Sequence, residues 1–305
     1  MLQSPMKKLL QLTILSLLPL LADADIQLQI CYGNPYTIVV EGRVLEERSF
    51  KESSKEDSWL KNTWKKVKQL VNDEVKNEKL SLVVGGEVYE RFTDDEGYFE
   101  FEINNTKAPW KNHENVEIYL DELNVTIHAS AFIVDDSVKV GVISDFDDTV
   151  IVSDVTNKLD LVKNTFFKNY KQREVVKGMR EQFKKILQTP NAPLFFVTGS
   201  PKQLYTAIHN FLNYHKFPKR TLITKKAHGD NADSLFDQQG YKVEKIEKLM
   251  KLFPHLQWVC FGDSGEKDKE VYGELLKTHP QQIKAIYIRN VANSEIEQIF
   301  PPLSK

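Results

Sequence analysis

The stretch VGVISDFDDT, residues 140–149, decides the fold of the C-terminal half of the chain. It reads as a buried strand that ends in three carboxylates, which is costly unless a cation or a ligand offsets their repulsion. Because residues two apart in an extended backbone share a face, Asp145 and Asp147 converge while Phe146 points away. Such a pair suits a nucleophile and an acid–base group on either side of a phosphoryl group. The plainer alternative is a charged turn at a strand end.

From about residue 139 onward, predicted strands and helices alternate, which is typical of a parallel sheet with helices on both faces. In such sheets ligands bind beyond the carboxyl ends of the strands. The predicted strands are 138–144, 193–198, 257–261 and 283–288, and the predicted helices are 159–170, 173–188, 202–213, 243–253 and 267–277.

Two further strand ends carry polar groups. The sequence TGSP, residues 198–201, follows the second predicted strand, and its hydroxyls and backbone N–H groups could hold a phosphate oxygen. The third strand ends in GDSGEKD, residues 262–268, where Asp263 and Asp268 could complete an oxygen-rich Mg²⁺ site. Lys242, close to the start of a predicted helix, could neutralise the acids, although most lysines are solvated surface charges.

This order of motifs resembles the haloacid dehalogenase superfamily, whose phosphatases use a phospho-aspartate. More closely, the chain resembles the phosphatidate phosphatase catalytic-domain family typified by the fungal actin-patch phosphatase. Two departures stand out: the family usually has Ser-Asn-Ser-Pro at residues 198–201 and His-Lys at residues 241–242. A weaker resemblance, in GRVLEER and FTDDEGYFEFEI, covers part of the preceding region. The stretches that carry the main resemblance, over about 139–291, are VISDFDDTVIVSDVTNK, FFVTGSPKQLY, FPKRTLITKK, YKVEKIEKLMKLFPHLQWVCFGDSGEKDKEVY and IKAIYIRNV.

The resemblance implies a haloacid-dehalogenase-like fold without a large cap, and a role for each motif. Asp145 would form an aspartyl-phosphate, and Asp147 would protonate the leaving alkoxide and then activate water. Thr198 and Lys242 would hold the phosphoryl oxygens as the remaining catalytic residues. The implied substrate-binding residues are Thr149, Gly199 and Ser200, with Thr149 bracing the loop. The implied Mg²⁺ ligands are Asp145, Asp147 through its backbone carbonyl, Asp263 and Asp268.

The implied activity is Mg²⁺-dependent hydrolysis of phosphatidate to diacylglycerol and phosphate. The segment between Thr149 and Thr198 is too short for a large cap domain, and an open site admits a bulky or membrane-embedded phosphomonoester. Basic side chains between the second strand and Lys242 favour contact with an anionic bilayer, or they only solubilise the surface. They are Lys202, Lys216, Lys219, Arg220, Lys225 and Lys226.

Two other functions stay open. One is a phosphatase of soluble or protein phosphomonoesters, and the other is a non-catalytic envelope protein whose N-terminal domain binds a partner. The intact set of Asp145, Asp147, Thr198, Lys242 and Asp263 argues against the second. The net charge of −2 gives no basic excess that would point to nucleic acid. The oligomeric state is not determined by the sequence.

The first 24 residues have the three parts of a secretory signal peptide. Lys7 and Lys8 precede an apolar run over residues 9–21, and Ala22-Asp23-Ala24 is a small-x-small cleavage site. An uncleaved anchor is the alternative, although a full span needs about 20 apolar residues. We therefore expect a periplasmic or secreted protein.

Residues 25–138 are predicted to form a small β-sandwich-like domain with one helix, before a phosphatase domain over 139–305. The helix, over residues 59–75, is interpreted as packing on the sandwich, or alternatively as an amphipathic surface that meets anionic lipid. Cys31 and Cys260 are expected to stay free thiols. The predicted strands are 36–45, 80–84, 87–92, 98–103, 116–120 and 123–132.

Overall fold

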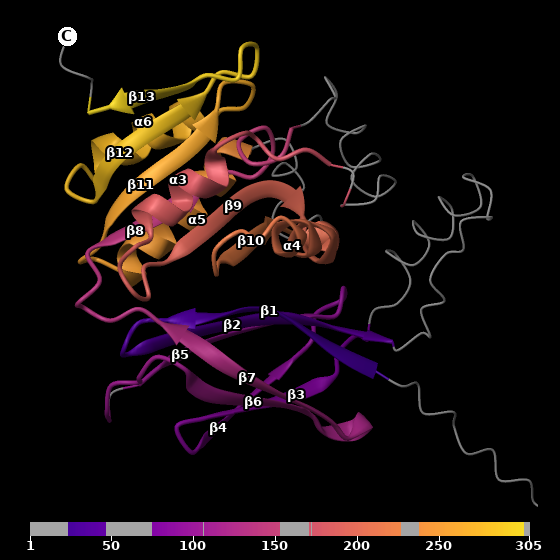
Figure 1. The fold of residues 1–305 in the computed structure, drawn as a ribbon. Coiled ribbons are helices and arrows are strands. Elements are labelled where there is room, and N and C mark those ends of the chain that lie inside the picture. Colours follow the sequence, from indigo (N-terminus) through magenta and orange to yellow (C-terminus); the bar gives the residue numbers. More distant parts are fainter. Residues whose placement is uncertain are drawn as a thin grey trace, which may run out of the picture.

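The computed structural model describes residues 24–46, 75–105, 107–152, 171, 173–226 and 238–301. The predicted signal peptide up to residue 23, the predicted helix at 59–75 except its last residue, and the predicted helix at 159–170 lie outside the described residues. Within these ranges no helix has both the length and the apolar character needed to cross a membrane. Two sheets lie one above the other (Figure 1).

The N-terminal half forms a seven-stranded sheet in the order β4-β3-β6-β7-β1-β2-β5. Each neighbouring pair is antiparallel except β1 and β7, which run parallel over two residue pairs. Strands β2 to β7 agree closely with the predicted ranges, β1 was not predicted, and the description of the seven strands as a sandwich domain stays a prediction. They are β1 (Ala24–Gly33), β2 (Thr37–Glu46), β3 (Lys79–Val84), β4 (Glu87–Phe92), β5 (Tyr98–Asn104), β6 (Glu114–Leu120) and β7 (Val125–Ile133), with a 3-10 turn η1 (Asp121–Leu123) before β7.

Alternation of apolar and polar side chains determines which face of this sheet is buried. In β5, Phe99, Phe101 and Ile103 are buried while Glu100 and Glu102 are exposed. The buried side chains of β2 and β5 share one core with those of β3 and β6. The apolar faces of these strands therefore pack against one another in a single core. Its first strand begins at Ala24, the last residue of the predicted signal peptide, which is buried.

The C-terminal half forms a six-stranded sheet in the order β10-β9-β8-β11-β12-β13. The strands are parallel except that β13 runs antiparallel to β12. The prediction of an α/β fold with a parallel sheet is confirmed at this level. The strands are β8 (Val140–Ser144), β9 (Leu194–Pro201), β10 (Thr221–Lys225), β11 (Gln257–Asp263), β12 (Ile283–Arg289) and β13 (Ile296–Phe300).

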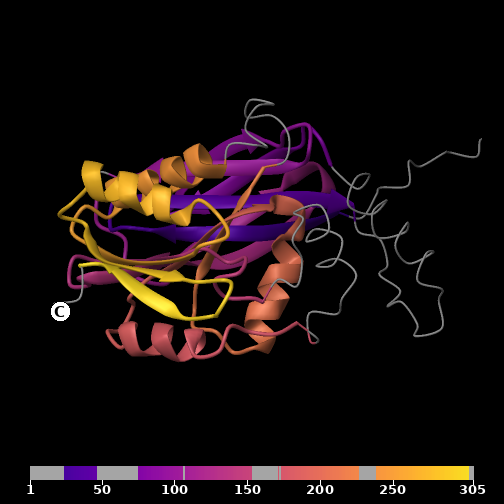
Figure 2. The same ribbon diagram turned by 90° about the horizontal axis from the view of Figure 1, so that it is seen from above.

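Helices cover both faces of this sheet (Figure 2). Helices α3 (Met179–Ile186) and α4 (Tyr205–Tyr214) cover one face, and α5 (Gln238–Leu252) and α6 (Asp268–Thr278) cover the other. A 3-10 turn, η3 (Lys202–Leu204), joins β9 to α4. Because both faces are buried, successive residues of β9 enter different cores: Phe195 packs with α5 and Phe196 packs with α3 and α4.

The two sheets share an apolar core across the predicted boundary at 138/139. The ring of Tyr32 in β1 lies 4.9 Å from that of Phe195 and 6.2 Å from that of Phe253, measured between centroids. The Asn34 amide donates a hydrogen bond to the carbonyl of Leu252 (2.8 Å). The hydroxyl of Tyr205 donates to the carbonyl of Gln29 (2.7 Å). Burial therefore couples the two halves, and the division of the chain into two domains stays a prediction.

Candidate active site

The candidate site lies at the carboxyl edge of the six-stranded sheet. Strands β9, β8 and β11 are parallel neighbours, so the residues that follow them meet at the same edge. Asp145 follows β8, Thr198 lies near the end of β9, and Asp263 ends β11. Lys242 reaches this edge from the first turns of α5, and Asp268 is the first residue of α6.

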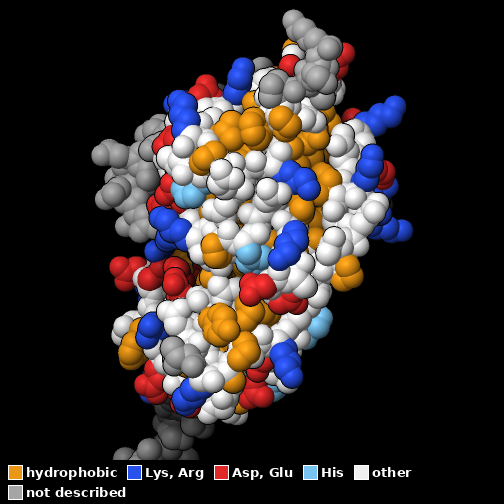
Figure 3. Space-filling model, turned by 90° about the vertical axis from the view of Figure 1, so that its left-hand side faces the viewer, with side chains coloured by type: hydrophobic (Ala, Val, Ile, Leu, Met, Phe, Trp, Pro, Cys, Tyr) orange, Lys and Arg blue, Asp and Glu red, His pale blue; other side chains and the backbone are white. Residues whose placement is uncertain are grey.

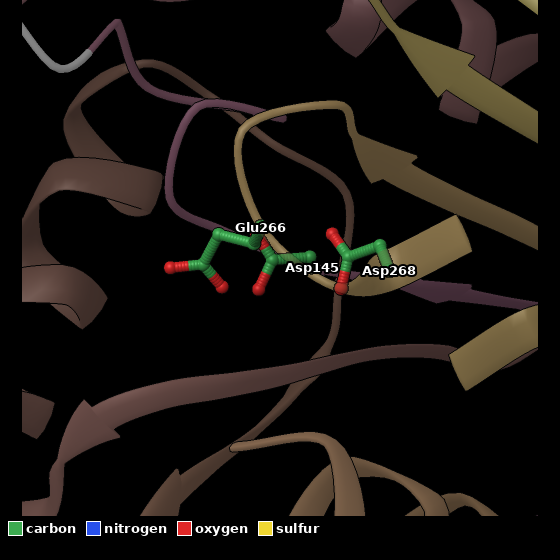
Figure 4. A group of neighbouring side chains, drawn as sticks. All are labelled: Asp145, Glu266 and Asp268. Carbon is green, nitrogen blue, oxygen red and sulfur yellow. The ribbon is translucent and has the colours of Figure 1, made fainter. Parts of the chain in front are cut away.

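The ammonium of Lys242 lies among three carboxylates. Its Nζ is 2.8 Å from Asp145 Oδ1, 3.0 Å from Glu266 Oε2 and 2.5 Å from Asp268 Oδ1. Figure 4 shows the three carboxylates, which come from two different loops. Burial lowers the pKa of Lys242, but Asp145 and Asp268 outweigh it and hold that pKa well above its usual range. The lysine is therefore a fixed cation.

Asp145 is completely buried, and one of its oxygens is unused. Its Oδ2 has no hydrogen-bond partner among the described residues, while Oδ1 faces Lys242. The backbone N–H of Asp145 donates to the carbonyl of Phe261 (2.9 Å), which fixes the main chain against β11. Burial raises the pKa of Asp145 well above its usual range, Lys242 opposes this rise, and Asp268 adds to it. Nucleophilic attack needs the ionised form of this carboxyl, which Lys242 favours and which a bound divalent cation would favour further.

Asp147 is held by two hydroxyls from β9. Its Oδ2 accepts hydrogen bonds from Thr198 Oγ1 (3.0 Å) and Ser200 Oγ (2.8 Å). Burial and the charge of Glu266 raise the pKa of Asp147 to about 6, and the two hydroxyls oppose that rise. A carboxyl with a pKa near neutrality can both donate and accept a proton. The structure thus brings Thr198 and Ser200 to Asp147.

Asp263 and Asp268 are joined through the backbone. Asp263 Oδ1 accepts hydrogen bonds from the N–H groups of Gly265 (2.6 Å) and Glu266 (3.0 Å). The N–H of Asp263 in turn donates to Asp268 Oδ2 (3.1 Å). Asp263 Oδ2 is buried and has no partner among the described residues. Burial and the nearby Asp268 raise the pKa of Asp263 to about 7.

Gly262 lets Asp268 come this close. A Cβ added to Gly262 would lie 2.4 Å from Cβ of Asp268. No side chain fits there unless the start of α6 moves. The glycine before Asp263 is therefore required by the close approach of the α6 loop to β11.

These oxygens fit a divalent cation. Asp145, Glu266 and Asp268 each offer an oxygen, and these oxygens lie within 4.8 Å of one another. The unpartnered Oδ2 atoms of Asp145 and Asp263 are the stronger indication. Lys242 already contacts one oxygen each of Asp145, Glu266 and Asp268, and backbone N–H groups already bind Asp263 Oδ1. An all-oxygen donor set suits Mg²⁺. Glu266 was absent from the predicted ligands, although it stands between the two acids that the sequence selected.

The remaining predicted residues have less defined surroundings. Thr149 is fully buried, and its hydroxyl has no partner among the described residues, so its bracing role stays a prediction. Gly199 lies under the amide of Gln238, whose Nε2 is 3.1 Å from the place a Cβ would take. Sequence reasoning did not select Gln238, because the contact depends on how α5 meets β9.

The predicted basic side chains divide between two edges of the sheet. Lys216, Lys219 and Arg220 precede β10, at its amino end, whereas Lys202, Lys225 and Lys226 lie at the carboxyl ends of β9 and β10. Lys202 pairs with Glu41 (2.7 Å) and Lys226 with Asp94 (2.6 Å). Figure 3 shows lysines and arginines scattered over one face among apolar side chains. The six predicted basic side chains form no single patch, and their contact with a membrane stays a prediction.

Residues 140–290 match the family described as "Phosphatidate phosphatase APP1, catalytic domain". This part of the chain is a member of that catalytic-domain family. The match includes every strand end described above. The description of the matched family names a phosphatase.

Two curated relatives match the same half of the chain. Phosphatidate phosphatase APP1 of Saccharomyces cerevisiae is 31% identical over 157 residues, which are 51% of this chain and 26% of the relative. An uncharacterized protein of Schizosaccharomyces pombe is 25% identical over 153 residues, 50% of this chain and 25% of the relative. The chain spans about a quarter of the length of these relatives.

Among solved structures, a ferredoxin-NADP+ reductase from Plasmodium falciparum is 10% identical, with a TM-score of 0.23. That alignment covers 88% of this chain and 95% of the reductase. A TM-score this low has no bearing on the fold or on the reaction.

Proposed function

We propose that this protein is a Mg²⁺-dependent phosphatidate phosphatase with a haloacid-dehalogenase-like catalytic domain. The observation that carries the proposal is the pairing of Asp145 and Asp147 at one strand end. Asp145 Oδ1 lies 2.8 Å from the Lys242 ammonium, and its buried Oδ2 has no hydrogen-bond partner among the described residues. The pKa of Asp147 is about 6. The family match of residues 140–290 supports the same reaction class.

In the proposed first step, Asp145 Oδ2 attacks phosphorus and forms the P–O bond of an aspartyl-phosphate. The bond from phosphorus to the alkoxide of diacylglycerol breaks, and Asp147 gives that alkoxide its proton. In the second step Asp147, now ionised, takes a proton from the water that attacks phosphorus. Inorganic phosphate leaves and Asp145 is regenerated.

The other residues hold charge in place. Lys242 stabilises the phosphoryl oxygens and is kept in position by Glu266 and Asp268. Thr198 and Ser200 hold Asp147 through its Oδ2. Asp145, Glu266 and Asp268, together with Asp263 through its unpartnered Oδ2, would hold a magnesium ion, which when bound would neutralise charge on the phosphoryl group.

Phosphate release by the purified protein tests this proposal. Mixed micelles of phosphatidate and a soluble phosphomonoester are compared, with Mg²⁺ and with a chelator. We expect Mg²⁺-dependent release from phosphatidate that Asp145→Asn reduces by about 10³-fold or more. Release from the soluble ester alone would move the substrate to soluble phosphomonoesters. If the Asp145→Asn protein is active, the assignment of Asp145 as the nucleophile is wrong.

The location of the reaction is a separate part of the proposal. The signal-peptide pattern of residues 1–24 supports a periplasmic or secreted enzyme. Sequencing the N-terminus of the protein recovered from each compartment of the cells that make it tests this part. An intact Met1 on cytoplasmic protein would overturn it.

A further inference from the structure

The residue that follows the candidate acid–base group Asp147 has an unusual backbone conformation. Asp148 lies directly between Asp147 and Thr149, and its φ is 54°. A left-handed conformation is uncommon for a residue other than glycine, although Asp and Asn adopt it more readily than most. Such a conformation persists only where the surrounding structure holds it. Asp148 had no role in the sequence analysis, so the question is what holds this peptide.

Arg289 contacts the backbone of Asp148. It ends β12, beside Asp263 in the β11–β12 register, and it is 3% exposed. Its Nη1 donates a hydrogen bond to the backbone carbonyl of Asp148 (2.6 Å), and the Asp148 carboxylate lies 4.0 Å away. A buried guanidinium is therefore fixed on the loop that carries Asp147.

The other end of the guanidinium is fixed as well. Its Nη2 donates to Ser294 Oγ (2.9 Å), in the turn that joins β12 to β13. That turn is closed by two backbone hydrogen bonds, from Asn290 N–H to the Glu295 carbonyl (2.7 Å) and from Ser294 N–H to the Asn290 carbonyl (2.8 Å). Arg289 thus links the antiparallel hairpin at the sheet edge to the loop after β8.

We propose that Arg289 is a positioning residue for the phosphatase reaction. Its hydrogen bond to the Asp148 carbonyl fixes the position of the neighbouring Asp147 carboxyl. This inference rests on the proposed function. Arginine suits the role because its planar fork reaches two acceptors in fixed directions, which the single ammonium of lysine does not. Holding this one peptide keeps the Asp147 carboxyl on Thr198 and Ser200, where the leaving group needs its proton.

The test compares Arg289→Ala and Arg289→Lys with a control, Arg91→Ala. Arg91 also donates to a backbone carbonyl, that of Glu90 (2.9 Å), but it lies in β4 of the seven-stranded sheet. We expect Arg289→Ala to lower kcat by about 100-fold while KM changes by less than about threefold. Arg289→Lys loses at least about tenfold in kcat, and added guanidinium ion restores part of the activity of Arg289→Ala.

Hydrogen exchange gives a readout that does not need activity. In Arg289→Ala the amides of residues 146–151 should exchange about tenfold faster than in the wild-type protein. Arg91→Ala should leave both that exchange and kcat unchanged. If wild-type protein hydrolyses phosphomonoesters and Arg289→Ala keeps its kcat, the inference is overturned. If the wild-type protein is inactive on every ester, the proposed function fails, and unchanged exchange would separately overturn the role of Arg289. If Arg289→Ala does not fold, Arg289→Lys decides by the same two measurements.

Discussion

The ammonium of Lys242 lies 2.8 Å from Oδ1 of Asp145, with both side chains buried at the end of β8. Two more carboxylates contact the same nitrogen. Breaking a buried ion pair by removing one partner is far more costly than losing an exposed pair, because a charge is left in a poorly solvating environment. In the proposed mechanism, stability and catalysis therefore depend on the same nitrogen atom.

Replacing Lys242 by methionine should destabilise the protein by about 3–5 kcal/mol and abolish activity, since it leaves the buried carboxylates without their cation. Urea unfolding and phosphate release measure the two effects. Lys248→Met is the control on the same helix, because Lys248 is 61% exposed and pairs only with Glu244 at i,i+4 among the ion pairs of the described residues. That control should stay within about 0.5 kcal/mol. Equal stability of the two variants would contradict the role of Lys242 as the central cation.

Without divalent cations the protein should become less stable as pH rises from about 4 to about 7. Burial raises the folded-state pKa of Asp147 to about 6 and of Asp263 to about 7, whereas unfolded aspartates titrate near about 3.9. Between these values the native state binds more protons than the unfolded state, so deprotonation favours unfolding. Carboxyls with a lowered pKa, such as Asp94, act only below this window.

Urea midpoints measured at steps from pH 4.5 to 7.5, roughly spanning that window, test the prediction in chelator and again in Mg²⁺. The decline should shrink in Asp147→Asn, which lacks one of the titrating carboxyls, and it should be offset at pH 7 by bound metal. A flat or rising curve for the wild-type protein in chelator would show that these carboxyls are not buried as described.

Gly262→Ala should lower activity by about 100-fold and cost about 1–3 kcal/mol, because its Cβ would lie 2.4 Å from Cβ of Asp268. Thermal unfolding and phosphate release measure both. Gly273→Ala is the control, since a Cβ at Gly273 meets nothing within 4 Å and Gly273 lies inside α6. It should stabilise the protein by about 0.5–1 kcal/mol without loss of activity. An active, stable Gly262→Ala protein would mean that Asp268 is not fixed against β11.

The two sheets should unfold in one transition, because Tyr32 is buried against Phe195 and Phe253. Tyr32→Ala should cost about 3–5 kcal/mol and lower the stability of both halves together. Calorimetry and fluorescence of the tryptophans report the transitions. Tyr36→Ala is the control, because the Tyr36 side chain belongs to the same region but is 57% exposed. Two separate transitions in the wild-type protein would contradict a shared core.

Much of this architecture was predictable because it follows from local pattern. Alternation in β5 and apolar runs such as β8 predict strands, and acids at the ends of β8 and β11 mark the edge at which we propose that ligands bind. Strand β13 was missed because it is an edge strand in which no residue is fully buried, so it lacks an apolar pattern. Strand β10 was missed because it is short and follows a basic segment.

Contacts between distant segments were not predictable. Glu266 at Lys242, Gln238 over Gly199 and Arg289 at Asp148 each depend on how a helix or hairpin meets a strand end. The burial of Tyr32 was not predictable either. Strand β1 carries apolar side chains on both faces, and the local sequence does not indicate which element covers the face that carries Tyr32.

That second face of β1 has a consequence for anyone who moves the catalytic half to another setting. Residues 140–290 expose the rings of Phe195 and Phe253 once β1 is removed, and a bare aromatic surface promotes aggregation. A transplanted catalytic segment needs a substitute cover, such as a designed strand with an aromatic residue where Tyr32 stands. Recombination at the 138/139 boundary would separate the rings of Phe195 and Phe253 from the strand that shields them from solvent.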